Sequence, residues 1–160
     1  MAQVATKADV AHDWELWIGR TAIVDEEPVT TWTQIRGFEA MPHPDQQPER
    51  QDATHMQSPG RARETIAGLL PEAEWSQEKQ LWPEDDGDIL LKELSDLTRL
   101  GTAEDVLIEF NIGPDTSDFR ETFRGEVSSY IATGTVGQIG MANLTLLIRD
   151  PQPTNPRVVS

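Results

Sequence analysis

An alternation of apolar and polar residues in the last third of the chain constrains the fold more than any other feature. In segment 106–112 four apolar residues fall on one side of an extended chain, and Leu107, Glu109 and Asn111 fall on the other. Segments 119–131 and 141–148 show the same period of two. The residues that would share a face in these three segments are Val106, Ile108, Phe110 and Ile112; Phe119, Phe123, Val127 and Ile131; and Ala142, Leu144, Leu146 and Ile148. Such alternation is typical of β-strands with one buried face, so the sequence predicts a sheet here.

Further strands are predicted in the first half of the chain. Residues 14–18 alternate and are followed by Gly19, which predicts a strand that ends at this glycine. A solvated turn at residues 25–28 precedes a second predicted strand at 31–38. Segment 63–69 has the pattern of another strand, and we favour a strand over a loop for segment 74–81.

One amphipathic helix is predicted at residues 88–100. Its leucines recur at helical spacing. They are Leu90, Leu94, Leu97 and Leu100. Asp88 can cap the start of the helix, and Gly101 can close its end in a left-handed conformation.

About seven strands and one helix imply a mainly β (α+β) fold. We expect a β-sandwich or open barrel with the helix packed on an edge or across one end. The predicted domain spans residues 14–150, preceded by an N-terminal arm at 1–13 and followed by a Pro-rich C-terminal tail at 151–160.

A long polar excursion at residues 41–60 interrupts this pattern between the strands predicted at 32–38 and 63–69. Connections inside a compact domain are usually about 4–6 residues long, so a polar loop of this length needs a reason. It is either disordered or reaches for a partner. Composition alone leaves both interpretations open.

Net charge limits the partners of the chain. There are 28 Asp and Glu against 13 Lys and Arg, which gives a net charge of -15 and opposes attraction to nucleic acid or to an anionic membrane. The same charge suits a surface that DNA passes without sticking. There is no Cys, no apolar run of membrane-spanning length and no apolar core of a secretory signal near Met1, so we expect a soluble protein without disulfides or thiolate metal sites.

No catalytic or cofactor constellation is evident. His12, His43 and His55 lack the spacing of metal ligands, and we interpret them as exposed polar residues. The acidic run 84–88 resembles half of a calcium loop but lacks the closing glutamate, so a charged approach to a helix N-terminus explains it more simply. We expect no enzyme activity, no cofactor and no metal.

Tryptophan is frequent, with 5 Trp against 1 Tyr. Most of these side chains are expected to pack in the core. Trp32 and Trp75 are flanked by polar residues on predicted strands, and such a position also suits a subunit interface.

The order of these elements resembles that of the major tail tube proteins of long non-contractile (siphovirus-type) bacteriophage tails. The resemblance covers residues 14–148. It rests on a Trp strand with a central Ile (Trp32 and Ile35), a loop with Asp-x-Thr (Asp52 and Thr54), the Gly-Leu turn 66–69, the helix, and the Phe-x-Gly-x-Val motif at 123–127. Each motif is common alone, and only their order and spacing carry the resemblance.

The resemblance implies a structural virion protein. Its subunits would form hexameric rings with a continuous inner β-barrel, and the rings would stack into a tube whose electronegative lumen conducts viral DNA during ejection. Implied partners are the tape measure protein, the tail terminator and the distal tail or baseplate proteins. The protein would be made in the host cytoplasm and reside in the tail of the virion.

The resemblance also implies roles for individual residues. The loop would contact the neighbouring ring through Pro44, Asp45, Glu49, Arg50, Asp52 and Thr54. The candidates for contact between subunits are Trp32, Ile35, Ile66, Leu69 and Trp75. Strands 32–38 and 61–66 would form a pair on the barrel wall.

Other functions remain open at the level of sequence. A tube subunit of a contractile tail, a gene transfer agent or a secretion apparatus would share this architecture. From other classes, the alternatives are a β-sandwich hydrolase and a small acidic adaptor or ligand-binding β domain whose Trp residues line a groove. Growth in size with concentration separates a ring-forming subunit from either of these.

Overall fold

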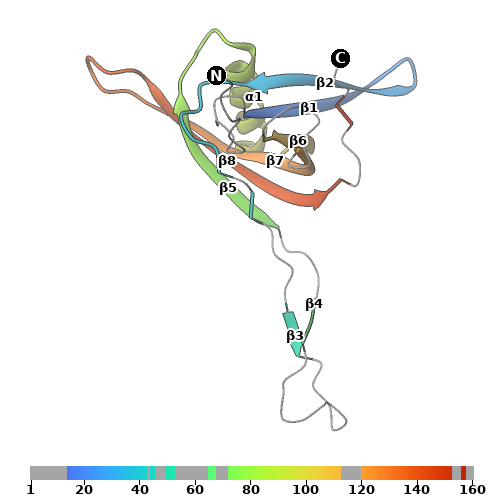
Figure 1. Cartoon of the computed structure of the whole chain (residues 1–160). Helices are drawn as coiled ribbons and strands as arrows, with labels where there is room; N and C mark the ends of the chain where they lie inside the picture. The colour runs from blue at the N-terminus through green and yellow to red at the C-terminus, as the bar shows by residue number, and fades with distance from the viewer. Residues whose placement is uncertain are drawn as a thin grey trace, which may run out of the picture.

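The computed structural model describes residues 14–42, 44–45, 50–52, 65–67, 72–112, 120–152 and 156–157 (Figure 1). Eight strands and one helix occur in these residues. In chain order they are β1 (Glu15–Val24), β2 (Glu27–Ile35), β3 (Arg50–Asp52), β4 (Thr65–Ala67), β5 (Ala73–Gln80), α1 (Asp86–Arg99), β6 (Val106–Asn111), β7 (Arg120–Thr133) and β8 (Met141–Pro151). The mainly β fold with a single helix in the described chain confirms the predicted fold class.

Six strands form one antiparallel sheet in the order β2-β1-β6-β7-β8-β5. The strands β3 and β4 pair with each other in a separate two-stranded sheet. The predicted pair of strands 32–38 and 61–66 on one wall is therefore wrong. A tight turn brings β1 and β2 together at a small loss of chain entropy, whereas the predicted pair would have had to close a loop of more than 20 residues.

The first hairpin is longer than predicted. Strand β1 continues through Gly19 to Val24, and the turn lies at Asp25 and Glu26, whose φ angles of 51° and 68° are both left-handed. Two left-handed central residues are typical of the type I′ turn that suits the twist of a hairpin. Gly19 does not end the strand. It makes room for a neighbour, because a Cβ built on it would lie 2.9 Å from Cζ3 of Trp32.

The two edges of the six-stranded sheet approach one another. Beyond β2, Phe38 forms an isolated bridge with Lys79 of β5, and the amide of Gln80 donates to the carbonyl of Gly37 at 2.9 Å. The φ of 97° at Gly37 lets the chain turn towards β5. The sheet is thus a partly closed barrel, which is one of the two architectures that the sequence predicted.

Helix α1 packs against β7 and β2 and covers one opening of this sheet (Figure 1). Leu91, Leu94 and Ser95 form its buried face, whereas Leu100, predicted to prolong the stripe, is exposed. The helix begins two residues earlier than predicted, and Asp85 rather than Asp88 is the N-cap.

The C-terminal end of α1 follows the predicted motif. Gly101 has a φ of 82°, and its amide and that of Thr102 donate to the carbonyls of Thr98 and Leu97. This is the Schellman pattern that a glycine at this position favours.

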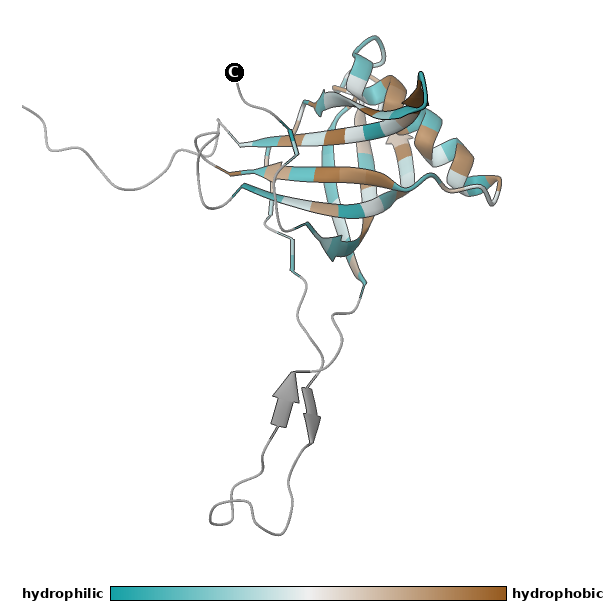
Figure 2. Cartoon of the chain, turned by 90° about the vertical axis from the view of Figure 1, so that its right-hand side faces the viewer, coloured by the Kyte–Doolittle hydropathy of each residue, from teal (hydrophilic) through white to brown (hydrophobic). Residues whose placement is uncertain are grey.

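The predicted alternation places the core correctly along β6 and β8 and fails at one point on β7. Val106, Ile108 and Phe110 are buried, as are the even-numbered apolar residues of β8. Figure 2 shows hydrophobic and hydrophilic positions following one another along the strands of the sheet. On β7 the register shifts between Val127 and Ser129, so Tyr130 faces the core and Ile131, predicted to face inward, is 61 % exposed. A β-bulge adds one residue and exchanges the faces of the strand beyond it.

Charged side chains cover the outer face of β6. The carboxylate of Glu109 has no exposed surface and accepts two hydrogen bonds of 2.8 Å from Arg157 and one of 3.1 Å from Arg120. The Arg157 guanidinium also lies 4.2 Å from the ring centre of Trp17. Within the predicted tail, position 157 is therefore bound to the sheet.

Candidate assembly surfaces

The β1–β2 hairpin extends past the rest of the sheet. Strand β1 pairs with β6 only from Glu15 to Gly19, whereas its pairing with β2 continues to Val24. Residues 20–31 therefore form a two-stranded ribbon, called here the β1–β2 ribbon, which projects at the upper right of Figure 1. At an antiparallel rise of about 3.4 Å per residue, the free part is roughly 17 Å long.

The tip of the ribbon combines apolar and acidic side chains. Ile23, Val24 and Val29 are 70 %, 51 % and 47 % exposed, and they flank the turn at Asp25 and Glu26. Grouped aliphatic residues in such a position mark an interaction surface more often than scattered single ones do.

The base of the ribbon is braced against the helix. Arg20 donates to Oε1 of Glu93 on α1 at 2.9 Å and to Oε1 of Glu104 after α1 at 3.1 Å. These hydrogen bonds, first the one that Arg20 donates to Glu104, raise the pKa of Arg20 above its ordinary value. The direction in which the ribbon leaves the subunit is thus coupled to α1.

A half-open groove of about 520 Å³ lies between α1 and β7, and we call it the α1–β7 groove. Its apolar walls include Leu81, Pro83, Ile89 and Ile131, while Lys92 and Arg99 of α1 line the same space. Ile89 and Ile131 are both more than half exposed. The groove therefore offers apolar surface beside two cations.

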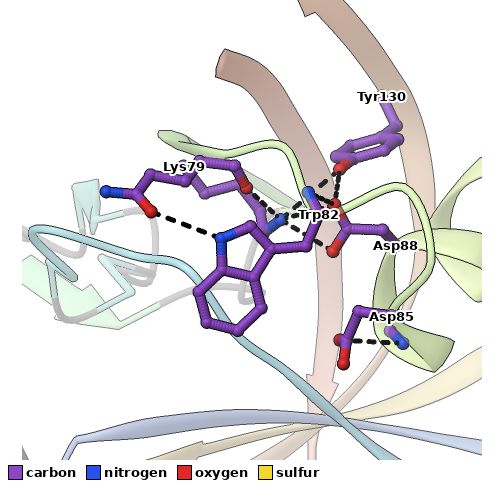
Figure 3. Close-up of polar contacts among 7 residues, drawn as sticks. Lys79, Trp82, Asp85, Asp88 and Tyr130 are labelled. Carbon is purple, nitrogen blue, oxygen red and sulfur yellow. Dashed lines mark hydrogen bonds and ion pairs between the residues drawn. The ribbon is translucent and has the colours of Figure 1, made fainter. Parts of the chain in front are cut away.

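Beneath the groove lies a buried charged cluster (Figure 3). Nζ of Lys79 on β5 lies 2.8 Å from Oδ1 of Asp88 on α1, and both side chains are almost fully buried. Asp88 also accepts hydrogen bonds from the Tyr130 hydroxyl and from the amide of Trp82, each at 2.7 Å. Burial first, and then Asp88, raises the pKa of Tyr130 far above its ordinary value.

The cluster is suited to holding elements together rather than to catalysis. Each oxygen of Asp88 accepts a hydrogen bond, and the ammonium group of Lys79 donates to Asp88 and to the carbonyl of Gln80. Lys79, Asp88 and Tyr130 come from three different elements, β5, α1 and β7. In the part of the chain that the structure describes, no group of three or more His, Cys, Asp or Glu side chains is placed to hold a metal ion. None of the helix residues in the same part forms a segment long and apolar enough to cross a membrane.

The residues predicted for contact between subunits are not gathered at one place. Ile35 and Trp75 have buried side chains, because the alternation of their strands turns them inward. The Trp75 ring packs edge-on against Phe38 and Phe110, and its Nε1 donates to the carbonyl of Pro42 at 2.9 Å. Neither side chain is on the surface of the subunit. The Trp32 ring is half-buried, where it lies against Gly19.

The predicted inter-ring residues are described only in part. Pro44 is buried and Asp45 is exposed. Arg50 and Asp52 lie on β3, and the candidate contact residue Ile66 lies opposite Gln51 on β4. Glu49, Thr54 and Leu69 are outside the described residues. The roles predicted for all of them stay predictions.

Sequence reasoning missed the exposed aliphatic tip of the ribbon. The sequence does contain a signal for this tip. Ile23 and Val24 directly precede the acidic turn, and residues 27–31 after the turn can form a strand that pairs back on the first one. It was overlooked because Gly19 was taken as the end of the first strand.

Comparison with known proteins shows a shared fold. No protein-family model matches the chain, and no curated protein does. Among solved structures it is similar to a chain of the tail of an empty GTA particle with C6 symmetry, at 18 % identity and a TM-score of 0.56 over 84 % of this chain and 90 % of that one.

Two similar chains come from an extracellular contractile injection system, PVC. One is from its sheath/tube terminator, at 12 % identity and a TM-score of 0.58 over 92 % of this chain and 98 % of that one. The other is from its sheath-tube complex, at 14 % identity and a TM-score of 0.57 over 91 % and 90 %. The chain therefore shares its fold with components of tail and injection-system assemblies.

Proposed function

We propose that this protein is a structural subunit of a tail tube that assembles into stacked hexameric rings and catalyses no reaction. The observation that carries the proposal is the fold of tail-assembly components, combined with a two-stranded ribbon that has an exposed aliphatic tip and extends past the rest of the sheet. Exposed aliphatic groups gathered at one place mark a surface that binds another molecule, and a subunit that must bind copies of itself needs such a surface.

The edges of the sheet support the same proposal. Strands β2 and β5 are its edge strands, and β2 runs for 9 residues. An edge strand of this length can pair with a strand of another chain. In a closed ring every such edge is paired with a neighbour, so no edge is left to recruit further chains. In the proposed ring, sheets of successive subunits join into one inner β-barrel.

The remaining parts of the proposal concern what the tube contacts. The net charge of -15 would let an electronegative lumen conduct viral DNA without retaining it. The loop at 41–60 would contact the next ring, and the tube would meet a tape measure protein, a tail terminator and distal tail or baseplate proteins in a virion. We favour a long non-contractile tail. The second candidate is the tube of a contractile injection system, because two of the similar structures come from one.

The test is the state of assembly of the purified protein. Sedimentation velocity over a wide range of concentrations, followed by negative-stain electron microscopy of the most concentrated sample, should reveal six-membered rings or tubes. A species that remains a monomer or dimer over the whole range, with neither rings nor tubes on the grid, would contradict the proposal and favour an enzyme or adaptor.

A further inference from the structure

We infer that neighbouring subunits are joined by insertion of the β1–β2 ribbon of one copy into the α1–β7 groove of the next. The inference rests on the proposed function and adds to it the two surfaces that meet. The occupant of the groove is thus a second copy of this chain.

The two surfaces match in their apolar groups. The ribbon ends in Ile23, Val24 and Val29, and the groove offers Ile89 and Ile131, all of which are about half exposed or more in the single chain. Bringing them together removes aliphatic surface from water on both copies at once. The free length of the ribbon, roughly 17 Å, allows its tip to enter a neighbour while its base stays in its own sheet.

The two surfaces also match in charge. The tip carries the exposed carboxylates of Asp25, Glu26 and Glu27. Lys92 and Arg99 of the groove share a single carboxylate, that of Asp96, at 2.7 Å and 2.8 Å. One positive charge thus remains at this group, in a chain whose net charge of -15 makes most other approaches of two copies repulsive.

The position of the two surfaces makes the contact head-to-tail. The ribbon projects at the upper right of Figure 1, and the β7–β8 hairpin, whose base contributes Tyr130, Ile131 and Ala132 to the groove, projects at the upper left. The ribbon is also anchored to the helix at Glu93. A contact between unlike surfaces leaves each copy able to bind two neighbours, and it generates a ring where the rotation between successive copies closes.

The absence of cysteine from the chain permits a direct test by disulfide cross-linking. Val24→Cys would place a thiol on the ribbon, and Ile89→Cys would place one in the groove; both positions are exposed, so both variants should fold. Mixed under mild oxidation, the two variants should give a covalent dimer that neither gives alone. The matched control pairs Val24→Cys with Ile139→Cys, which lies on the loop of the β7–β8 hairpin and is also well exposed.

A chain that carries both Val24→Cys and Ile89→Cys should form a ladder of covalent oligomers that ends at six. If the tip and groove variants cross-link no more than the control pair while the unmodified protein forms rings on the grid, the inference is wrong and the proposed function stands. If the unmodified protein forms neither rings nor tubes, the proposed function itself fails.

A charge exchange provides an independent readout. Glu26→Lys alone and Arg99→Glu alone should each raise the concentration needed for ring formation, by roughly tenfold for the loss of about 1.4 kcal/mol of favourable interaction. Both changes in one chain should restore much of the assembly, because the new lysine of one copy faces the new glutamate of the next. An additive loss in the double variant would count against the contact.

Discussion

Lys79 has no exposed surface, and its ammonium group depends on the carboxylate of Asp88 for compensation. Removing one partner of a buried ion pair leaves the other charged and desolvated, which costs about 3–5 kcal/mol. We therefore expect Lys79→Met to lower the free energy of unfolding by that amount in urea titrations. Lys92→Met is the control. It breaks an exposed i,i+4 pair with Asp96 and should cost less than about 1 kcal/mol. Equal losses in the two variants would contradict this account.

Tyr130 is the only tyrosine of the chain, so phenolate absorbance reports on it alone. Its folded pKa is raised, whereas an unfolded tyrosine ionises near about 10. Above that pH the unfolded state binds fewer protons than the folded state, so stability falls as the pH rises. We expect no phenolate signal at pH 10–11 until circular dichroism shows unfolding. Half-ionisation near pH 10 in a folded sample would show that the hydroxyl is neither buried nor held by Asp88.

Residues of this kind mark the limit of what the sequence predicts. The period of two identified Val106, Ile108 and Phe110 as core residues, because apolar side chains that share one face of a strand are stabilised by burial in the interior. It could not predict that Lys79 and Asp88 are also buried, since each is costly to bury alone and their pairing across β5 and α1 depends on tertiary structure.

At the scale of elements, the start of α1 provides a separate test. The Asp85 carboxylate accepts a hydrogen bond from the amide of Gly87, while Asp88, first expected as the cap, binds Lys79. Asp85→Ala should lower the free energy of unfolding by about 1 kcal/mol, the usual effect of losing an N-cap. Asp86→Ala removes a charge from the same turn without removing the cap and should cost less. Chemical denaturation of the two variants at equal ionic strength measures the difference, and a larger loss for Asp86→Ala would exclude Asp85 as the cap.

The strands show which element properties are local and which are not. Strand β8 was predicted almost to its ends, because nothing interrupts its alternation. On β7 the bulge after Val127 depends on how two paired strands accommodate one extra residue, and no residue pattern in β7 alone reveals it. The role of Gly19 is likewise not visible in its own strand. It leaves space for the ring of Trp32 on the neighbouring strand and does not form a turn.

At the scale of the whole molecule, the open barrel and single helix followed from counting patterned segments, whereas the strand order did not. Strands β2 and β5 are separated by residues 36–72 and occupy opposite edges of the sheet. The segment that follows β2 connects them through the bridge between Phe38 and Lys79 and the hydrogen bond from Gln80 to Gly37. Pairing across such a long connection is determined by the collapsed fold, so the sequence supported more than one arrangement.

Deletion of residues 46–51 tests the role of the long loop. It removes Arg50 and Gln51 of β3 but no residue of the six-stranded sheet, so circular dichroism and thermal unfolding of the monomer should stay close to those of the parent. If the loop joins successive rings, negative-stain images should show isolated rings without long tubes. Tubes of normal length would contradict an inter-ring role.

The brace that Arg20 makes with Glu93 and Glu104 has a geometric consequence for the proposed ring. In a head-to-tail contact, the number of copies is set by the angle between the surface that enters and the surface that receives, and six copies require a turn of about 60° at each step. A small error at one step is repeated at every other, so a loosened Arg20 would yield open spirals or rings of unequal size from subunits that still bind one another. Closure of the ring would then depend on a single residue, Arg20, at the base of the β1–β2 ribbon.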